Sequence, residues 1–182
     1  MMTTTATDET PRVWIGCLHC YNSGRLTGDW FPAAGADLVT VEQVHRISRS
    51  PLSGCEELWV MDHEYLPIDG ECSPMEAARW AERLGEVDEH LRPAFRAWVS
   101  AGAYAADSEG LPDVDEFTDA HCGTWPSFRA YTEELAESCG MMLDWPELAV
   151  RHFDWAGWAR DLAHDYTVVD APDGEVHIFR SL

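Results

Sequence analysis

The stretch Ser73 to Leu84, with the sequence SPMEAARWAERL, has several features that predict a helix. The secondary structure predicted before this helix differs from that predicted after it. The serine supplies an N-cap, the proline suits the first helical position, and Glu76 adds a carboxylate to the first turn. Met75, Ala78 and Leu84 are expected on its apolar side. Strand-forming segments with one short helix precede this helix, and a run of helices followed by a hairpin comes after it. This order predicts an α+β fold.

The segment before this helix predicts a small sheet with one helix. Val13 to Cys20 (VWIGCLHC), Arg25 to Phe31 and Glu57 to Met61 have the composition of short strands. Thr40 and Gln43 form a capping box at the start of a short helix. We expect an N-terminal α+β domain over residues 11–72, with a frayed tail before it.

The middle of the chain is predicted to be helical, over residues 73–108. Leu91 to Ala101 continues the helical pattern, with Phe95, Trp98 and Val99 facing inward. A mixed α/β C-terminal domain is expected over residues 109–182. Its predicted elements are helices over 113–120, 127–139 and 154–163, and a hairpin of strands 166–169 and 175–179 around Asp173-Gly174.

The charge of the chain is unusual. There are 33 Asp and Glu residues against 12 arginines and no lysine, for a net charge of −21. Such a field repels nucleic acids and anionic membranes and attracts basic surfaces. Because 46% of the residues are hydrophobic, the chain has enough apolar material for a folded core. Charge alone fits either a soluble acidic surface or a surface that binds a basic partner.

The acidity is concentrated in the middle of the sequence. Residues 1–52 have a net charge of −1, residues 53–150 of −17 and residues 151–182 of −3. On predicted helices, Glu82, Glu86 and Glu89 are spaced to share a face, as are Asp115 with Asp119 and Glu133 with Glu137. Duplex DNA carries one charge per ~1.7 Å, so 21 charges correspond to roughly 36 Å of duplex. This distribution favours a surface that binds a groove built for phosphate.

The six cysteines predict reduced thiols and no metal site. No secretory signal or membrane-length apolar run is seen, so a cytoplasmic protein is expected. Cys17 and Cys20 form a CxxC, but the other cysteines are scattered and offer no second pair. In a continuous strand, Cys17 and His19 would face away from Cys20. A metal-dependent enzyme using Cys17, His19 and Cys20 stays a minority alternative.

The sequence also lacks the patterns of common catalytic sites. Asp62-His63-Glu64 lacks the H-x-E spacing of zinc deaminases, and there is no P-loop, dinucleotide fingerprint or G-x-S-x-G. Adjacent residues such as His121 and Cys122 rarely form a nucleophile–base pair. We therefore expect no enzyme and no cofactor. An acidic module that binds another basic protein, such as a nucleoid protein or polymerase, remains the alternative.

Several blocks of the sequence resemble the ArdA antirestriction family, from about Pro11 to Phe179. The most specific are the first and last blocks, whereas the CxxC of Cys17 and Cys20 and the region from Glu86 to Pro126 match less well. The blocks are Cys17-Leu18 with Tyr21-Asn22-Ser23-Gly24, Leu26, Gly28 and Trp30; Glu56 to Trp59 with Asp62 to Tyr65; Tyr131 to Leu135; Phe153 to Trp155 with Ala159 to Leu162; and Gly174 to Phe179.

The resemblance implies an elongated α+β protein of three small domains, usually a homodimer, whose carboxylates mimic the phosphates of bent DNA. The implied partner is the methyltransferase core of a Type I restriction–modification enzyme, with no direct binding of nucleic acid or membrane. Phe117 and Trp125 are candidate exposed dimer contacts. The carboxylates expected on the mimic surface are Asp62, Glu64, Glu76, Glu82, Glu86, Asp88, Glu89, Asp113, Asp115, Glu116, Asp119, Glu133, Glu134, Glu137, Asp144, Glu147 and Asp161.

Overall fold

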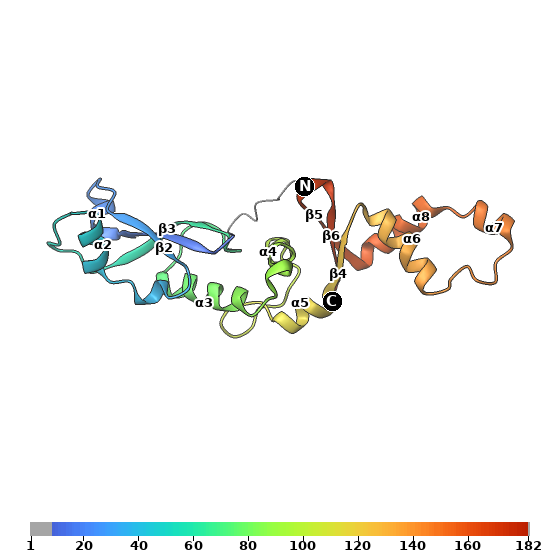
Figure 1. Ribbon diagram of the computed structural model, residues 1–182, viewed down its shortest axis with the longest axis horizontal. Helices are drawn as coiled ribbons and strands as arrows, with labels where there is room; N and C mark the ends of the chain where they lie inside the picture. The colour runs from blue at the N-terminus through green and yellow to red at the C-terminus, as the bar shows by residue number, and fades with distance from the viewer. Residues whose placement is uncertain (1–8, 182) are drawn as a thin grey trace, which may run out of the picture. The chain divides into compact units, whose positions relative to one another are not determined.

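The computed structural model describes residues 9–181 and confirms the α+β class (Figure 1). These residues form eight α-helices and two three-stranded antiparallel sheets. The chain divides into two compact units, Met1–Glu89 and His90–Leu182, and each contains one of the sheets. The division into three domains stays a prediction. Most of the expected N-terminal tail lies outside the described residues.

The sheet of the first unit has the order β2-β1-β3. Its strands are β1 (Arg12–Cys17), β2 (Gly28–Pro32) and β3 (Leu58–Glu64). On the central strand, Val13 and Ile15 are fully buried while Trp14 alternates to the other face. The Trp14 ring lies over Gly16 and Gly28, where an added Cβ would meet it at 2.5 and 2.4 Å. Only glycine leaves room for this ring.

The predicted strand to Cys20 is wrong, because the strand ends at Cys17 and helix α1 (Leu18–Asn22) follows it directly. The backbone N–H of Ser23 donates to the carbonyls of His19 and Cys20, and the Ser23 hydroxyl donates to His19 O at 2.9 Å. These bonds close a helical turn that β-propensity could not indicate. The change of direction decides which way Cys17 and Cys20 face.

The other helices of the first unit are η1 (Ala36–Leu38), α2 (Val41–Ile47) and α3 (Pro74–Gly85). The capping box of Thr40 and Gln43 is present at the start of α2, and Ser73 Oγ accepts from the Glu76 N–H at 3.1 Å. Helix α2 packs against β1 and β2, and α3 packs against η1 and β3. Both helices begin where the sequence predicts.

The apolar side of α3 differs from the prediction at one residue. Ala78 and Leu84 are buried with Trp80, but 58% of Met75 is exposed. Met75 and Leu84 are nine residues apart, which is two and a half helical turns and places them on opposite sides. The sequence pattern therefore included one residue too many.

The sheet of the second unit has the order β4-β6-β5. Strands β5 (Tyr166–Asp170) and β6 (Val176–Arg180) form the predicted hairpin, with the short helix η4 (Pro172–Gly174) between them. Strand β4 (His121–Trp125) pairs with β6 and was not expected. Its sequence, HCGTW, has neither an apolar run nor a clear alternation, so only its pairing with β6 defines it.

Further helical segments belong to the second unit, and the first of them begins at Glu89, the last residue of the first unit. They are η2 (Glu89–Leu91), α4 (Arg92–Ser100), α5 (Val114–Ala120), α6 (Phe128–Ser138), α7 (Glu147–Arg151), α8 (Trp155–Leu162) and η3 (Ala163–Asp165). Helix α4 packs against β5 and β6, and α6 packs against β4 and α8. Phe95, Trp98 and Val99 face inward as predicted. Gly140 follows α6 with a φ of 64°, as expected for a C′ glycine.

Candidate functional site

The acids expected on the interaction surface are distributed over both units. In the first unit, Asp62 and Glu64 lie in β3, Glu76 and Glu82 in α3, and Glu86, Asp88 and Glu89 after it. In the second unit, Asp113, Asp115, Glu116 and Asp119 belong to α5 and its N-cap; Glu133, Glu134 and Glu137 to α6; and Glu147 and Asp161 to α7 and α8, with Asp144 between α6 and α7.

All of these carboxylates reach solvent. Glu64, Glu116 and Glu133 are half-buried, and the other fourteen are exposed. Burial of a carboxylate without a partner is costly, so an acidic chain must keep these groups at the surface in order to fold. Exposure thus agrees with an interaction surface and also with an acidic surface that serves solubility.

The acids Glu82, Glu86 and Glu89 do not share one helix, contrary to the prediction. Helix α3 ends at Gly85, so Glu86 is its C-cap residue and Glu89 opens η2. Arg83 Nε also lies 3.5 Å from Glu86 Oε2. The fixed i,i+4 spacing of a helix therefore does not apply to this group.

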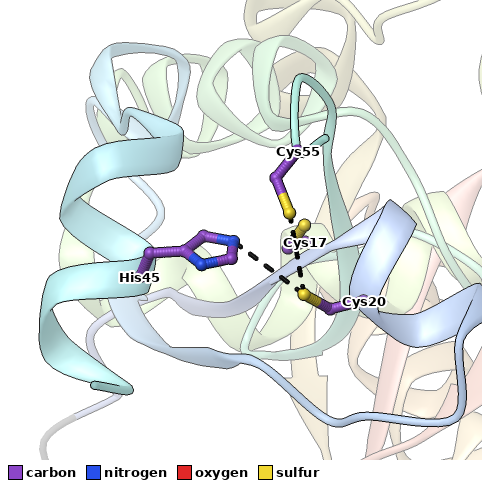
Figure 2. Close-up of side chains that lie close together, drawn as sticks. All are labelled: Cys17, Cys20, His45 and Cys55. Atoms are coloured by element: carbon purple, nitrogen blue, oxygen red, sulfur yellow. Dashed lines mark hydrogen bonds between the residues drawn. The ribbon is translucent and has the colours of Figure 1, made fainter. Parts of the chain in front are cut away.

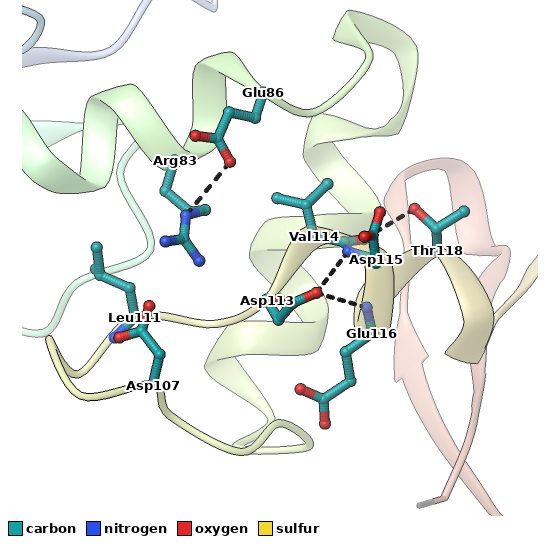
Figure 3. A network of polar contacts seen from close by, with 9 residues as sticks. All are labelled: Arg83, Glu86, Asp107, Leu111, Asp113, Val114, Asp115, Glu116 and Thr118. Carbon is teal, nitrogen blue, oxygen red and sulfur yellow. Dashed lines mark hydrogen bonds and ion pairs between the residues drawn. The ribbon is translucent and has the colours of Figure 1, made fainter.

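Helix α5 presents its acids as the sequence predicts, and Figure 3 shows its start. Asp113 is the N-cap, and its Oδ1 accepts from the N–H groups of Asp115 and Glu116 at 2.8 and 3.0 Å. Asp115 and Asp119 are both exposed and lie one turn apart. The carboxylates of the first turn also stabilise the positive end of the helix. Acidity at this site therefore supports the local fold.

Helix α6 carries a second pair of acids at helical spacing. Glu133 and Glu137 lie four residues apart within the helix, and Glu134 is exposed beside them. Arg129 Nε lies 2.7 Å from Glu133 Oε1, one turn earlier. The helix therefore combines one carboxylate that pairs with arginine and two whose charge meets solvent.

Arginines offset the acidity at several places where the sequence suggested unrelieved charge. Arg12 Nε lies 2.6 Å from Glu64 Oε2, and Arg151 Nη2 lies 2.9 Å from Glu147 Oε1. The hydrogen bond from Arg12 lowers the pKa of the Glu64 carboxyl. Exposed pairs of this kind contribute little to stability. They offset local repulsion but leave the overall field strongly negative.

The two units share the negative charge almost equally. Residues 1–89 contain 16 acids and six arginines, and residues 90–182 contain 17 acids and six arginines. Their net charges are therefore −10 and −11. The concentration in residues 53–150 includes the second half of the first unit and much of the second. Each unit thus carries its own acidic surface.

The expectation that Phe117 is an exposed dimer contact is wrong. Phe117 is fully buried, with ring centroids 5.1 Å from Phe95 and 5.5 Å from Trp98. Trp125 is half-buried, and its indole N–H donates to Cys122 O at 2.9 Å. Phe117 occupies the inward position of the amphipathic helix α5, which its acidic neighbours obscured in the sequence.

The positions of Asp62, His63 and Glu64 bear on the catalytic interpretation of this sequence, and the lengths of the helices bear on a membrane span. Asp62, His63 and Glu64 are successive residues of β3, so His63 points to the face opposite the two carboxylates. Within residues 9–181, no helix is long and apolar enough to cross a membrane.

The fold and the surface together define an acidic α+β protein with exposed carboxylates on both of its units. The model of the family described as Antirestriction protein (ArdA) matches residues 13–177. Since this match covers most of the chain, the protein belongs to the ArdA antirestriction family. A comparison with curated proteins gave no match. Membership supports an antirestriction function and an interaction with restriction–modification enzymes in general.

Proposed function

We propose that the protein mimics DNA and occupies the DNA-binding groove of Type I restriction–modification enzymes, at their methyltransferase core. Restriction would then be blocked by competition, without catalysis. The observation that carries this proposal is the exposure of acids on strands, helices and caps of both units, in a chain of the antirestriction family. Exposed acids on both units suit a partner that binds a long polyanion.

The geometry of α5 and α6 supports the proposal at short range. Carboxylates four residues apart are separated by ~6 Å along a helix, and phosphates on one DNA strand advance ~3.4 Å per residue. The distance along the helix between two carboxylates such as those of Asp115 and Asp119 is therefore similar to the rise of about two nucleotides. Basic residues that contact neighbouring phosphates would find acceptors at comparable spacing.

The same field would speed the encounter with the target. Complementary charge raises association rates well above those of neutral surfaces, and salt screens this effect. The absence of lysine from the sequence means that few cations compete for the carboxylates. In this proposal the protein does not itself bind nucleic acid, because its net negative charge repels DNA. It acts in the cytoplasm, where restriction enzymes cut incoming DNA.

A homodimer is part of the proposal. Two chains would present twice the number of carboxylates, which corresponds to about twice the length of duplex, or roughly 70 Å. The molar mass of the purified protein in solution tests this part, because a strictly monomeric protein at micromolar concentration would contradict it.

A displacement experiment tests the proposal directly. A labelled duplex is bound to a purified Type I methyltransferase core at about 50 mM salt, and the protein is then added. We expect release of the duplex, with inhibition weakening steeply by about 200 mM salt. Binding to the enzyme without release of DNA would contradict competition. Recovery of only a nucleoid protein or polymerase from a pull-down would favour the acidic-module alternative.

A further inference from the structure

Four side chains with soft or imidazole donors converge in the first unit (Figure 2). They are Cys17 at the end of β1, Cys20 in α1, His45 in α2 and Cys55 in the loop before β3. One ligand atom from each lies within 4.8 Å of the others. Cys17, Cys20 and His45 are buried, and Cys55 is half-buried.

The change from strand to helix after Cys17 brings the first two thiols together. Because α1 starts at Leu18, Cys17 is its N-cap residue and Cys20 lies in its first turn, and their sulfur atoms lie within 4.8 Å of each other. The Leu18 N–H donates to Glu57 O at 3.0 Å, which holds the loop containing Cys55 against this turn. Gly54 allows the sharp bend before Cys55, with a φ of 75°.

Two separations at Cys20 are close to those of a tetrahedral metal centre. With Zn–S near 2.3 Å and Zn–N near 2.05 Å, tetrahedral ligands lie about 3.8 Å apart for two sulfurs and about 3.6 Å for sulfur and nitrogen. Cys20 Sγ lies 3.8 Å from Cys55 Sγ and 4.0 Å from His45 Nε2. A disulfide needs about 2.05 Å between sulfurs, so Cys20 and Cys55 are separate thiols, and their spacing is close to that of two sulfur ligands of one ion.

The groups around the cluster also suit a cation bound by thiolates. His45 Nδ1 lies 3.2 Å from the carbonyl oxygen of Ser50. A proton on Nδ1 would donate to this carbonyl and leave the Nε2 lone pair facing Cys20, an arrangement typical of metal-bound histidine. Arg25 Nη2 lies 3.7 Å from Cys20 Sγ. Three thiolates around a divalent cation leave one negative charge, which this arginine offsets.

We propose that Cys17, Cys20, His45 and Cys55 bind one Zn²⁺ ion as a structural site. Three cysteines and one histidine fill all four positions of tetrahedral zinc, so no position stays open for a substrate. The ion would tie α1, α2 and the loop before β3 to the end of β1. This inference does not depend on DNA mimicry. It replaces the minority alternative that paired His19 with the CxxC, because His19 is exposed and outside the cluster.

Metal analysis of the full chain tests the proposal. The protein is purified under reducing conditions without chelator or a metal-affinity column, and its metals are measured by mass spectrometry. We expect about one zinc per chain, and below about 0.1 in Cys20→Ser and Cys55→Ser. Cys139→Ser is the matched control, because Cys139 is an exposed thiol outside the cluster, and it should retain the zinc.

A second measurement tests zinc binding if the serine variants fail to fold. Apoprotein prepared from the wild type is titrated with Co²⁺, which should give the visible absorption of tetrahedral thiolate coordination at one equivalent. His45→Cys should retain about one zinc, since four cysteines also bind zinc, whereas His45→Ala should lose it. Stoichiometric iron, or a wild type that holds no zinc and takes up neither Zn²⁺ nor Co²⁺, would overturn the proposal.

Discussion

Phe117 lies at the centre of the aromatic core of the second unit. Its ring packs edge-on against Phe95, tilts against Trp98 and Phe179, and stacks on His121. Three of the other six residues of its helix are acidic, and Phe117 is the one large side chain that α5 buries. Burial of a phenylalanine contributes several kcal/mol, which is a large share of the stability of a small domain.

Replacement of Phe117 by alanine should lower the free energy of unfolding by about 3–5 kcal/mol, because a cavity opens where four rings meet. Denaturant unfolding followed by the fluorescence of the core tryptophans measures this loss. Trp125→Ala, at a half-buried position, should cost less. A Phe117→Ala protein with normal stability and a changed molar mass would instead restore the dimer-contact hypothesis.

At the level of elements, helix caps were the features most readable from the sequence. Thr40, Ser73, Asp113 and Ser127 all cap the helices that they were expected to start, because the cap is a local interaction with a fixed spacing. Strand β4 was not readable, since its pairing partner β6 lies about fifty residues later. Pairing at that range leaves no periodic signal in five residues.

The proposed zinc site was missed for the same reason. Only Cys17 and Cys20 are close in sequence, and the predicted strand placed them on opposite faces. His45 and Cys55 come from separate segments, and His45 looked like one of several dispersed histidines. Ser23 and Gly24 favour a turn, but this turn lies after Cys20 and so did not indicate that the strand ends at Cys17. The carboxylates, by contrast, were expected at the surface because charged groups are rarely buried.

Two substitutions of Asp113, the N-cap of α5, distinguish its hydrogen bonding from its charge. Asp113→Ala should cost about 0.5–2 kcal/mol of stability, since two backbone N–H groups lose their acceptor. Asp113→Asn keeps an acceptor and removes the charge, so stability should stay close to that of the wild type. Thermal unfolding compares the three proteins. Equal losses in both variants would mean that charge, and not the cap, stabilises the helix.

The sheet of the second unit contains a buried histidine that should make its stability depend on pH. His177 in β6 lies with its Nδ1 2.9 Å from the Thr124 hydroxyl of β4. Burial lowers its pKa, and the smaller opposing effect of the Glu175 carboxylate does not reverse this direction. The unfolded chain therefore binds a proton at a higher pH than the folded chain does, and the stabilisation is lost as pH falls through about 6.5 toward the folded pKa.

His177→Gln tests this dependence, because glutamine can still bond to Thr124 but does not titrate near neutral pH. The difference in unfolding free energy between wild type and variant should shrink from pH 7.5 to about pH 5. Urea unfolding at a series of pH values gives this difference free of the shared effect of the many surface acids. A difference that stays constant with pH would contradict a buried neutral histidine.

For the whole molecule, charge is divided evenly between the two units, and the arginines pair locally with some of the acids. Net charge alone would attract any basic protein, so the proposal of DNA mimicry depends on where the carboxylates lie. Solubility would require only their number. A test must therefore change the position of the removed charges while it keeps their number constant.

Two variants with the same net charge make this comparison. One removes four exposed acids of α5 and α6, through Asp115→Asn, Asp119→Asn, Glu134→Gln and Glu137→Gln. The other removes four exposed acids outside the expected surface, through Asp37→Asn, Glu42→Gln, Asp165→Asn and Asp170→Asn. Both change the net charge from −21 to −17. Equal unfolding midpoints establish that each variant is folded.

The decisive measurement is the concentration of each variant that displaces duplex DNA from a Type I methyltransferase core. Four lost contacts of about 0.5–1 kcal/mol each should weaken the first variant by roughly 30-fold or more. The second variant should stay within about threefold of the wild type, because only long-range steering changes. Equal weakening of both variants would show that total charge, and not a phosphate-like arrangement, governs binding, and would contradict DNA mimicry.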